Sequence, residues 1–112
     1  MKEFAFTCQL KNDDEIVEKY CTYHEAVWPE VLASLQNVGI VSGRIFRSGR
    51  RLFMLIRTTD EYEPESSMTA HWNSHPRVRE WEELMRSFQE RPPDAGEGDG
   101  AWVPMERVWA LD

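Results

Sequence analysis

The stretch IVSGRIFRSGRRLFMLIRT, residues 40–58, determines much of the fold. Residues 40–47 and 52–58 contain most of its β-branched and other apolar side chains, and a short turn signal at residues 48–50 separates them. This pattern predicts two antiparallel strands joined as a hairpin. The run at residues 52–56 is apolar without alternation, which indicates a strand that is covered on both faces.

Strand and helix signals alternate on either side of this hairpin. Residues 3–10 alternate as a strand with one apolar face does, and residues 102–111 are expected to form the last strand. Apolar residues recur at helical spacing from Ile16 to Val38, and Pro29 either interrupts this helix or begins a second one. After a polar loop at residues 58–67, Ser74 and Pro76 predict the start of another helix, which ends at residues 91–93.

The resulting order of elements is β-α-β-β-α-β. This order predicts a ferredoxin-like split β-α-β fold of the α+β class, with both helices on one face of an antiparallel four-stranded sheet. The other face of such a sheet is bare, and two copies of the chain can pack these faces together. We therefore expect residues 1–112 to form one domain that assembles as a homodimer.

Composition and charge exclude several classes of function. A net charge of −7 over 112 residues gives an acidic surface, so neither nucleic acid nor a membrane is an expected partner. The apolar run at residues 52–56 is far shorter than the ~20 residues of a membrane span, and residues 1–10 do not resemble a signal peptide. The two cysteines, Cys8 and Cys21, lie in a strand pattern and a helix pattern and are expected to be buried free thiols in the reducing cytoplasm.

Four side chains in the first predicted helix could carry chemistry. Tyr20 and His24 are four residues apart and share a helix face, Trp28 lies one further turn along, and Tyr23 is adjacent to His24. An imidazole can both give and take a proton near neutral pH, and a phenol can orient it or donate to a substrate hydroxyl. The same stripe is also typical of a packed core that contains one hydrogen-bonded histidine, and both interpretations stay open.

Two other segments are weaker candidates. His71 and His75 have the spacing of a metal-chelating pair on one helix, but Ser74 and Pro76 indicate that a helix begins between or after them. The acidic, glycine-rich residues 94–100 are expected to be a solvated connection, with a flap over a pocket as the alternative.

The chain resembles the L-rhamnose mutarotases over nearly its whole length. The resemblance is carried mainly by Tyr20, Tyr23 and His24 followed by Trp-Pro-Glu at residues 28–30, and the closing residues 108–111 match in order. It implies a dimeric α+β barrel that interconverts the α and β anomers of a pyranose without a metal or another cofactor. It places His24 at the proton-donor position and Tyr20 at a substrate-contacting one, and Trp28 and Trp81 would form walls for the sugar.

Two positions depart from the family pattern. Gly43 stands where rhamnose-binding members usually carry a tyrosine, and Glu80-Trp81 stands where they carry paired tryptophans. These changes open the pocket and bring in a carboxylate, so Glu80 is a speculative substrate contact. The substrate is expected to be a 6-deoxyhexose such as L-rhamnose or L-fucose. The alternatives are a non-catalytic sugar-binding or regulatory dimer and a monooxygenase built on the same dimeric barrel.

Overall fold

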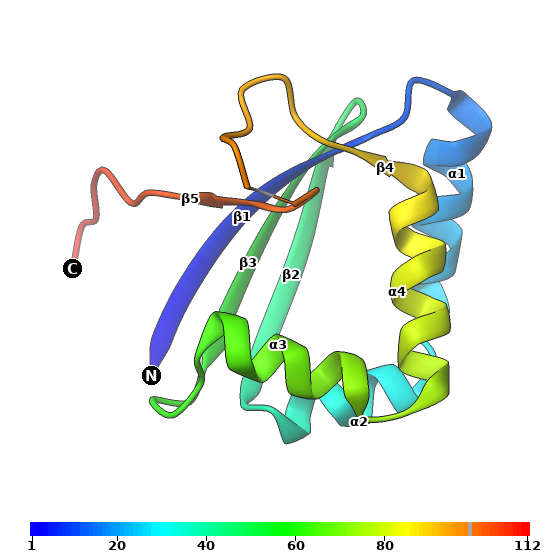
Figure 1. The fold of residues 1–112 in the computed structure, drawn as a ribbon. Coiled ribbons are helices and arrows are strands. Elements are labelled where there is room, and N and C mark those ends of the chain that lie inside the picture. The colour runs from blue at the N-terminus through cyan, green and yellow to red at the C-terminus, as the bar shows by residue number, and fades with distance from the viewer. Residues whose placement is uncertain (99) are drawn as a thin grey trace.

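A computed structural model of the chain describes residues 1–98 and 100–112. The elements in order are β1 (Lys2–Leu10), α1 (Asp14–Tyr23), the short 3-10 helix η1 (His24–Ala26), α2 (Pro29–Asn37), β2 (Ile40–Ser48), β3 (Arg51–Thr58), α3 (Pro64–Asn73), α4 (Pro76–Phe88), β4 (Gln89–Glu90) and β5 (Val103–Met105) (Figure 1). Pro29 is the first residue of α2, so the proline begins a second helix. Asp13 caps α1, because its carboxylate accepts a hydrogen bond from the Glu15 N–H at 2.9 Å.

The sheet has the strand order that the sequence predicts. Strands β2, β3, β1 and β4 lie side by side in that order and every pairing is antiparallel. The outer edge of β1 is shared by two short strands, since β4 pairs with Gln9 and Leu10 while β5 pairs with residues 5–7. The prediction of one long last strand over residues 102–111 was therefore wrong: only Val103–Met105 pairs, and the rest of the chain runs away from the sheet (Figure 1).

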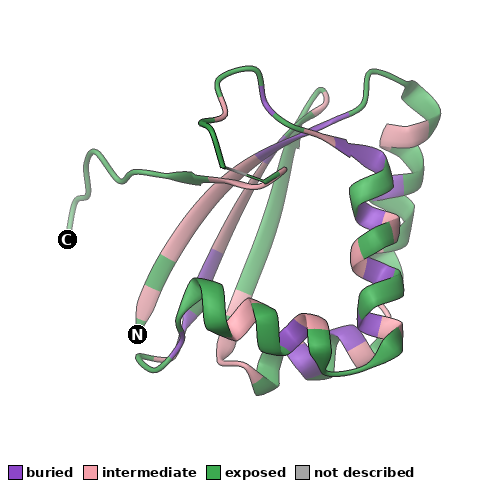
Figure 2. Cartoon of the chain, in the orientation of Figure 1, coloured by how far each residue is buried: buried purple, intermediate pink, exposed green. Residues whose placement is uncertain are grey.

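The core lies where one end of the sheet meets the helices. Cys8, Leu10 and Leu52 contribute the sheet side, and the buried residues of α1, α2 and α4 gather opposite them (Figure 2). The helical members of this core are Tyr20, Val31, Val78, Trp81, Met85 and Phe88. Burial raises the pKa of the Cys8 thiol to about 11, whereas Cys21 is exposed, so only one of the two predicted buried thiols is buried.

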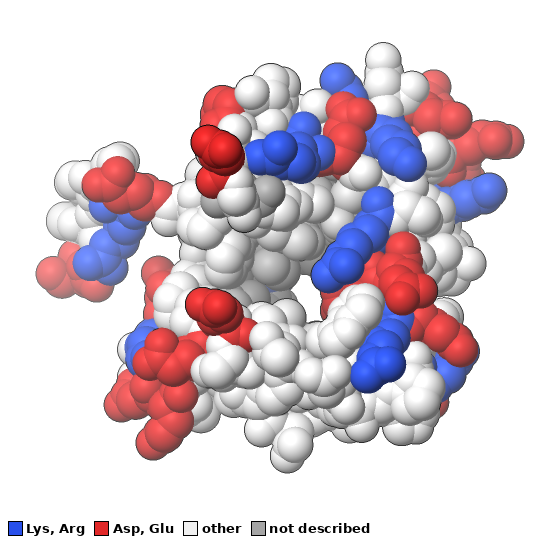
Figure 3. Space-filling view, in the orientation of Figure 1, with Lys and Arg blue, Asp and Glu red and all other residues white. Residues whose placement is uncertain are grey.

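The helices stand away from the sheet over the rest of its inner face. Side chains alternate across a strand, so Phe6 and Met54, which pair with each other, lie on the same face as Cys8 and Leu52. Ile45 pairs with Met54 on that face and is still 39% exposed, although the face is turned toward the helices. Figure 3 shows the molecule hollowed between the sheet and α4.

The outer face of the sheet carries no helix. Phe53 and Leu55 of β3 point to this side and are half-buried. In a single chain, the expectation that β3 is covered on both faces is therefore met only on the inner face, which is turned toward the helices. No helix within residues 1–98 and 100–112 is long and apolar enough to cross a membrane.

Candidate active site

His24 lies at the end of α1, and its Nδ1 is 2.8 Å from the backbone carbonyl oxygen of Tyr20. A carbonyl oxygen can only accept a hydrogen bond, so Nδ1 must carry the hydrogen in this contact. The other ring nitrogen, Nε2, is therefore the one that can gain or lose a proton. The backbone of α1 thus fixes both the orientation of the half-buried imidazole and its tautomer.

Two of the aromatic residues predicted to accompany His24, Tyr20 and Trp81, contact its ring. The His24 ring lies 4.4 Å from Tyr20 and 5.4 Å from Trp81 between ring centroids, and Trp28 lies 5.2 Å from Trp81. Tyr20 and Trp81 are only 3% and 4% exposed, so the stripe is also part of the core. Burial raises the pKa of the Tyr20 phenol well above its usual range, with smaller contributions that include the negative charge of Glu82.

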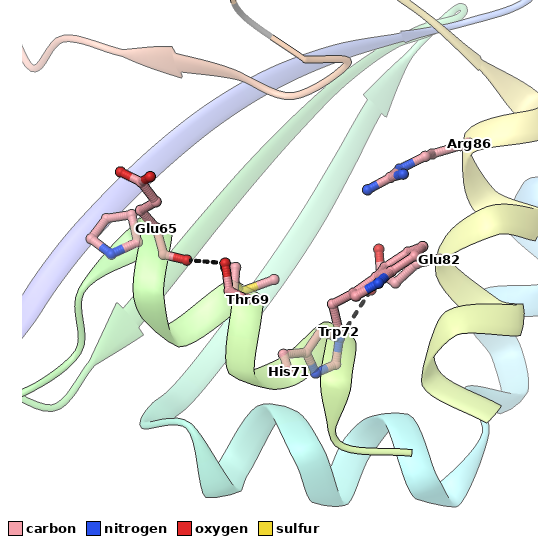
Figure 4. Close-up of a pocket in the computed structure, with 8 residues that line it drawn as sticks. Glu65, Thr69, His71, Trp72, Glu82 and Arg86 are labelled. Carbon is pink, nitrogen blue, oxygen red and sulfur yellow. Dashed lines mark hydrogen bonds and ion pairs between the residues drawn. The ribbon is translucent and has the colours of Figure 1, made fainter. Parts of the chain in front are cut away.

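A hollow of about 320 Å³ opens between α3 and α4. Its volume is at the lower end of the range of small-molecule sites. Figure 4 shows Glu65 and Thr69 on the α3 side of this hollow, and Glu82 and Arg86 reaching toward it from α4. The Arg86 guanidinium lies 4.9 Å from the centroid of the Trp72 ring. The hollow therefore offers a carboxylate, a cation and a flat apolar ring, which are the groups that bind polyhydroxylated ligands.

A chain of hydrogen bonds holds the Glu82 carboxylate in position. Glu82 Oε1 is 3.0 Å from Nε2 of His71, and Nδ1 of His71 is 2.7 Å from the Ser34 hydroxyl. The Ser34 hydroxyl is in turn 2.8 Å from the Ser74 hydroxyl. His71 is 1% exposed and belongs to α3, while Ser34 comes from α2 and Glu82 from α4. Because three helices contribute these groups, no spacing in the sequence could have revealed them.

Other predicted residues lie away from this hollow. Glu80 is exposed on α4 and forms an ion pair with Arg77 at 2.9 Å, and the guanidinium carbon of Arg77 lies 3.7 Å from the centroid of the Trp28 ring. His24 lines neither this hollow nor a second one of about 710 Å³ between α1 and α4, where Tyr23 is a lining residue. His24 instead contacts Tyr20 and Trp81.

The weaker candidates also have definite places. His71 lies in the last turn of α3 and His75 is the N-cap of α4, so the two imidazoles do not share one helix, as Ser74 and Pro76 indicated. In the predicted loop at residues 94–100, Asp99 lies outside the described residues. Arg91 donates a hydrogen bond to the carbonyl oxygen of Gly96 at 2.6 Å, which connects this loop to the end of β4.

The fold and the site together define a ferredoxin-like α+β protein with an open hollow between sheet and helices, bordered by acidic, basic and aromatic side chains. Comparison with known proteins narrows this class. The chain belongs to the L-rhamnose mutarotase family, whose model matches residues 3–111. The chain is therefore an isomerase of the sugar mutarotase type, and the resemblance noted in the sequence is confirmed.

Individual relatives agree with this assignment. An L-fucose mutarotase of Xanthomonas campestris pv. campestris is 37% identical over 113 residues, which cover 99% of this chain and 89% of the relative. An L-rhamnose mutarotase of Sinorhizobium fredii is 28% identical over 99% of both chains. The crystal structure of an L-rhamnose mutarotase from Formosa agariphila has the same fold, with a TM-score of 0.70, 19% identity and full coverage of both chains.

Proposed function

We propose that this protein interconverts the α and β anomers of a 6-deoxyhexose pyranose, without a cofactor, and that His24 is its general acid/base. The observation that carries the proposal is the hydrogen bond from Nδ1 of His24 to the Tyr20 carbonyl, which leaves Nε2 to exchange protons. Mutarotation needs one proton removed from the anomeric hydroxyl and one delivered to the ring oxygen, followed by the reverse on the other face of the carbonyl. These steps require proton transfer and no change of oxidation state.

In this proposal protonated His24 donates its Nε2 proton to the ring oxygen while the bond between that oxygen and the anomeric carbon breaks, and a second group takes the proton of the anomeric hydroxyl as the carbonyl forms. The open-chain aldehyde then rotates, and ring closure returns one proton to Nε2 and the other to the new anomeric hydroxyl. Tyr20 and Trp81 hold the imidazole between two rings, at 4.4 Å and 5.4 Å. General acid–base help of this kind is typically worth about 10²–10⁴-fold in rate.

L-fucose is our first choice of substrate, with L-rhamnose second. The relative named for L-fucose is 37% identical, against 28% for the one named for L-rhamnose. Gly43 adds no side chain to the inner face of β2, and Glu82 brings a carboxylate to the hollow. The missing tyrosine at position 43 favours a sugar other than L-rhamnose.

The test is anomer exchange measured by saturation-transfer NMR on equilibrated L-fucose and L-rhamnose. The protein should accelerate exchange of at least one sugar, and His24→Ala should remove most of the gain. His24→Asn is the sharper variant, because its amide can still donate to the Tyr20 carbonyl but has no group equivalent to Nε2; we expect a loss of about 10²–10⁴-fold. His75→Asn, which retains a helix-capping side chain, is the matched control and should keep full activity.

The same experiment separates the alternatives. A sugar-binding or regulatory dimer would give a calorimetric binding signal and leave anomer exchange at the uncatalysed rate. A monooxygenase would likewise leave exchange unchanged, and added haem would shift its Soret band on binding. Either result would overturn the mutarotase proposal for this chain.

We also propose a homodimer in the cytoplasm as the working form. Support for the dimer is the uncovered outer face of the sheet, where Phe46 is 55% exposed and stacks on Phe53 at 6.0 Å. Support for the location is that Cys8 and Cys21 are both free thiols.

A further inference from the structure

Glu82 is the carboxylate of the hollow whose position is most tightly held. It lines the hollow with its side chain 29% exposed, and its Oε1 lies 3.0 Å from Nε2 of the fully buried His71. Figure 4 shows the two side chains joined across the gap between α3 and α4, with Arg86 above Glu82 on the open side. One carboxylate oxygen is therefore committed to the protein, and Oε2 is left for a ligand.

Counting hydrogens along the buried chain shows how His71 holds Glu82. Ser74 donates to the backbone carbonyl of His71 at 2.7 Å, so the single hydrogen of Ser34 must serve the Ser34–Ser74 contact. Ser34 then accepts from Nδ1–H of His71, and in this arrangement Nε2 can also donate to Glu82 only if both ring nitrogens carry a hydrogen. If both hydroxyls rotate, Ser34 donates to Nδ1 instead, and Nε2–H still donates to Glu82. In both arrangements the His71–Glu82 contact contains one proton.

We propose that Glu82 is the second proton-transfer group of the mutarotase reaction and that His71 is the positioning residue that orients it; this inference rests on the proposed function. In ring opening, Oε2 of Glu82 takes the proton of the anomeric hydroxyl as the carbon–oxygen double bond forms. At the same time, protonated His24 gives its Nε2 proton to the ring oxygen as that oxygen leaves the anomeric carbon. Ring closure on the other face returns both protons, so each group ends in its starting state.

The positions of the two groups suit this division of work. His24 and Glu82 come from neighbouring helices, and Trp81, which contacts His24, directly precedes Glu82 in α4. For one pyranose to meet both groups, it must extend from the hollow beside Glu82 past Trp81 to Nε2 of His24, which does not line the hollow.

The decisive experiment measures anomer exchange and sugar binding with Glu82→Gln, using the sugar that the wild type accelerates most. The amide has the shape of the carboxylate but cannot take up a proton, so kcat should fall about 10²–10⁴-fold while the Kd from calorimetry changes by less than about threefold. Glu83→Gln, an exposed neighbour on α4, is the matched control and should retain wild-type kcat. A Glu82→Gln variant with kcat within about twofold of wild type overturns the inference.

His71 is tested by rescue. His71→Gln can still donate to Glu82 from its amide, whereas His71→Leu cannot, so His71→Gln should keep clearly more of kcat than His71→Leu at similar KM. Equal kcat for the two variants, when circular dichroism shows both folded, would mean that His71 acts only in packing. If His71→Leu does not fold, His71→Gln is compared with Glu82→Gln instead. A lower kcat for His71→Gln than for Glu82→Gln then overturns the positioning role.

The two levels of proposal fail in different ways. A wild-type protein that accelerates neither sugar removes the proposed function and this inference with it. A wild-type protein that is active and loses activity with His24→Asn, but not with Glu82→Gln, removes the inference and leaves the proposed function standing.

Discussion

Residue 43 decides how much room the inner face of β2 leaves for a sugar. Gly43 is paired with Ile56, which is paired with Phe4, so these three positions form one row on the face turned toward the helices. A Cβ built on Gly43 would lie 3.4 Å from the Ile56 side chain, which is close but requires only a small adjustment. A larger side chain at this position therefore extends from the inner face of the sheet toward the helices without breaking the strand.

We predict that Gly43→Tyr shifts the preference of the enzyme from L-fucose toward L-rhamnose. The phenol would restore the side chain that rhamnose-binding members usually carry at this position and would narrow the space above Ile56. The ratio of kcat/KM for L-rhamnose to that for L-fucose should rise about tenfold, the scale at which one altered pocket contact discriminates between substrates. Gly43→Ala, which adds bulk at Cβ and no hydroxyl, is the control, and an unchanged ratio in a folded Gly43→Tyr would contradict this account of specificity.

The sequence could predict His24 and not Glu82 for a physical reason. Tyr20, His24 and Trp28 follow each other at helical spacing within one segment, so periodicity alone places them together. Glu82 acquires its role only through His71 and Ser34, which arrive from two other helices. The sequence offered Glu80 because it adjoins Trp81, but the rotation of α4 turns Glu80 to the surface beside Arg77.

At the scale of elements, the junction between α2 and β2 depends on one residue. Gly39 has φ of +106°, a region that side chains rarely adopt, and its carbonyl accepts a hydrogen bond from Thr59 N–H at 2.8 Å. A Cβ at this position would lie 2.7 Å from the Thr59 hydroxyl oxygen. The glycine thus lets the chain at the end of α2 lie close to the end of β3.

We predict that Gly39→Ala lowers the free energy of unfolding by about 1–3 kcal/mol, because the strained φ and the contact with Thr59 both oppose the new methyl group. Gly49→Ala is the matched control. Gly49 also has a positive φ, +59°, but nothing lies within 4 Å of a Cβ built on it. Urea unfolding of both variants separates the two contributions. An equal loss in the two variants would show that the close approach to Thr59 has no energetic consequence.

The elements that the sequence predicted best are those whose signal is local. The hairpin and the helix beginning at Pro76 follow from turn residues and a proline, whereas α3 begins at Pro64, within the residues 58–67 that were predicted as a loop. The last strand was overestimated because residues 106–111 have a strand-like composition but pair with no strand among the described residues. Strand pairing depends on what lies alongside, and composition carries no information about that.

On the scale of the whole molecule, one group of exposed apolar residues lies where a second copy could cover it. Phe46 and Phe53 lie together on the outer face of the sheet, opposite the side that bears the helices. The segment beyond β5 runs away from the body of the chain (Figure 1) and carries Trp109, which is 73% exposed. Exposed apolar groups gathered on one face are typical of protein–protein interfaces.

We therefore predict that the protein is a homodimer at micromolar concentration and that Phe46→Glu converts it to a monomer. The new carboxylate would have to be buried against the same face of the second copy, next to its own symmetry mate, and a buried unpaired charge costs several kcal/mol. Light scattering coupled to size-exclusion chromatography measures the mass directly.

The matched control is Leu32→Glu, which changes an exposed apolar residue of α2. This variant should remain dimeric, since the helices face solvent in the proposed assembly. A wild-type mass of one chain at tens of micromolar would contradict the dimer, and a dimeric Phe46→Glu variant would move the interface away from this face of the sheet.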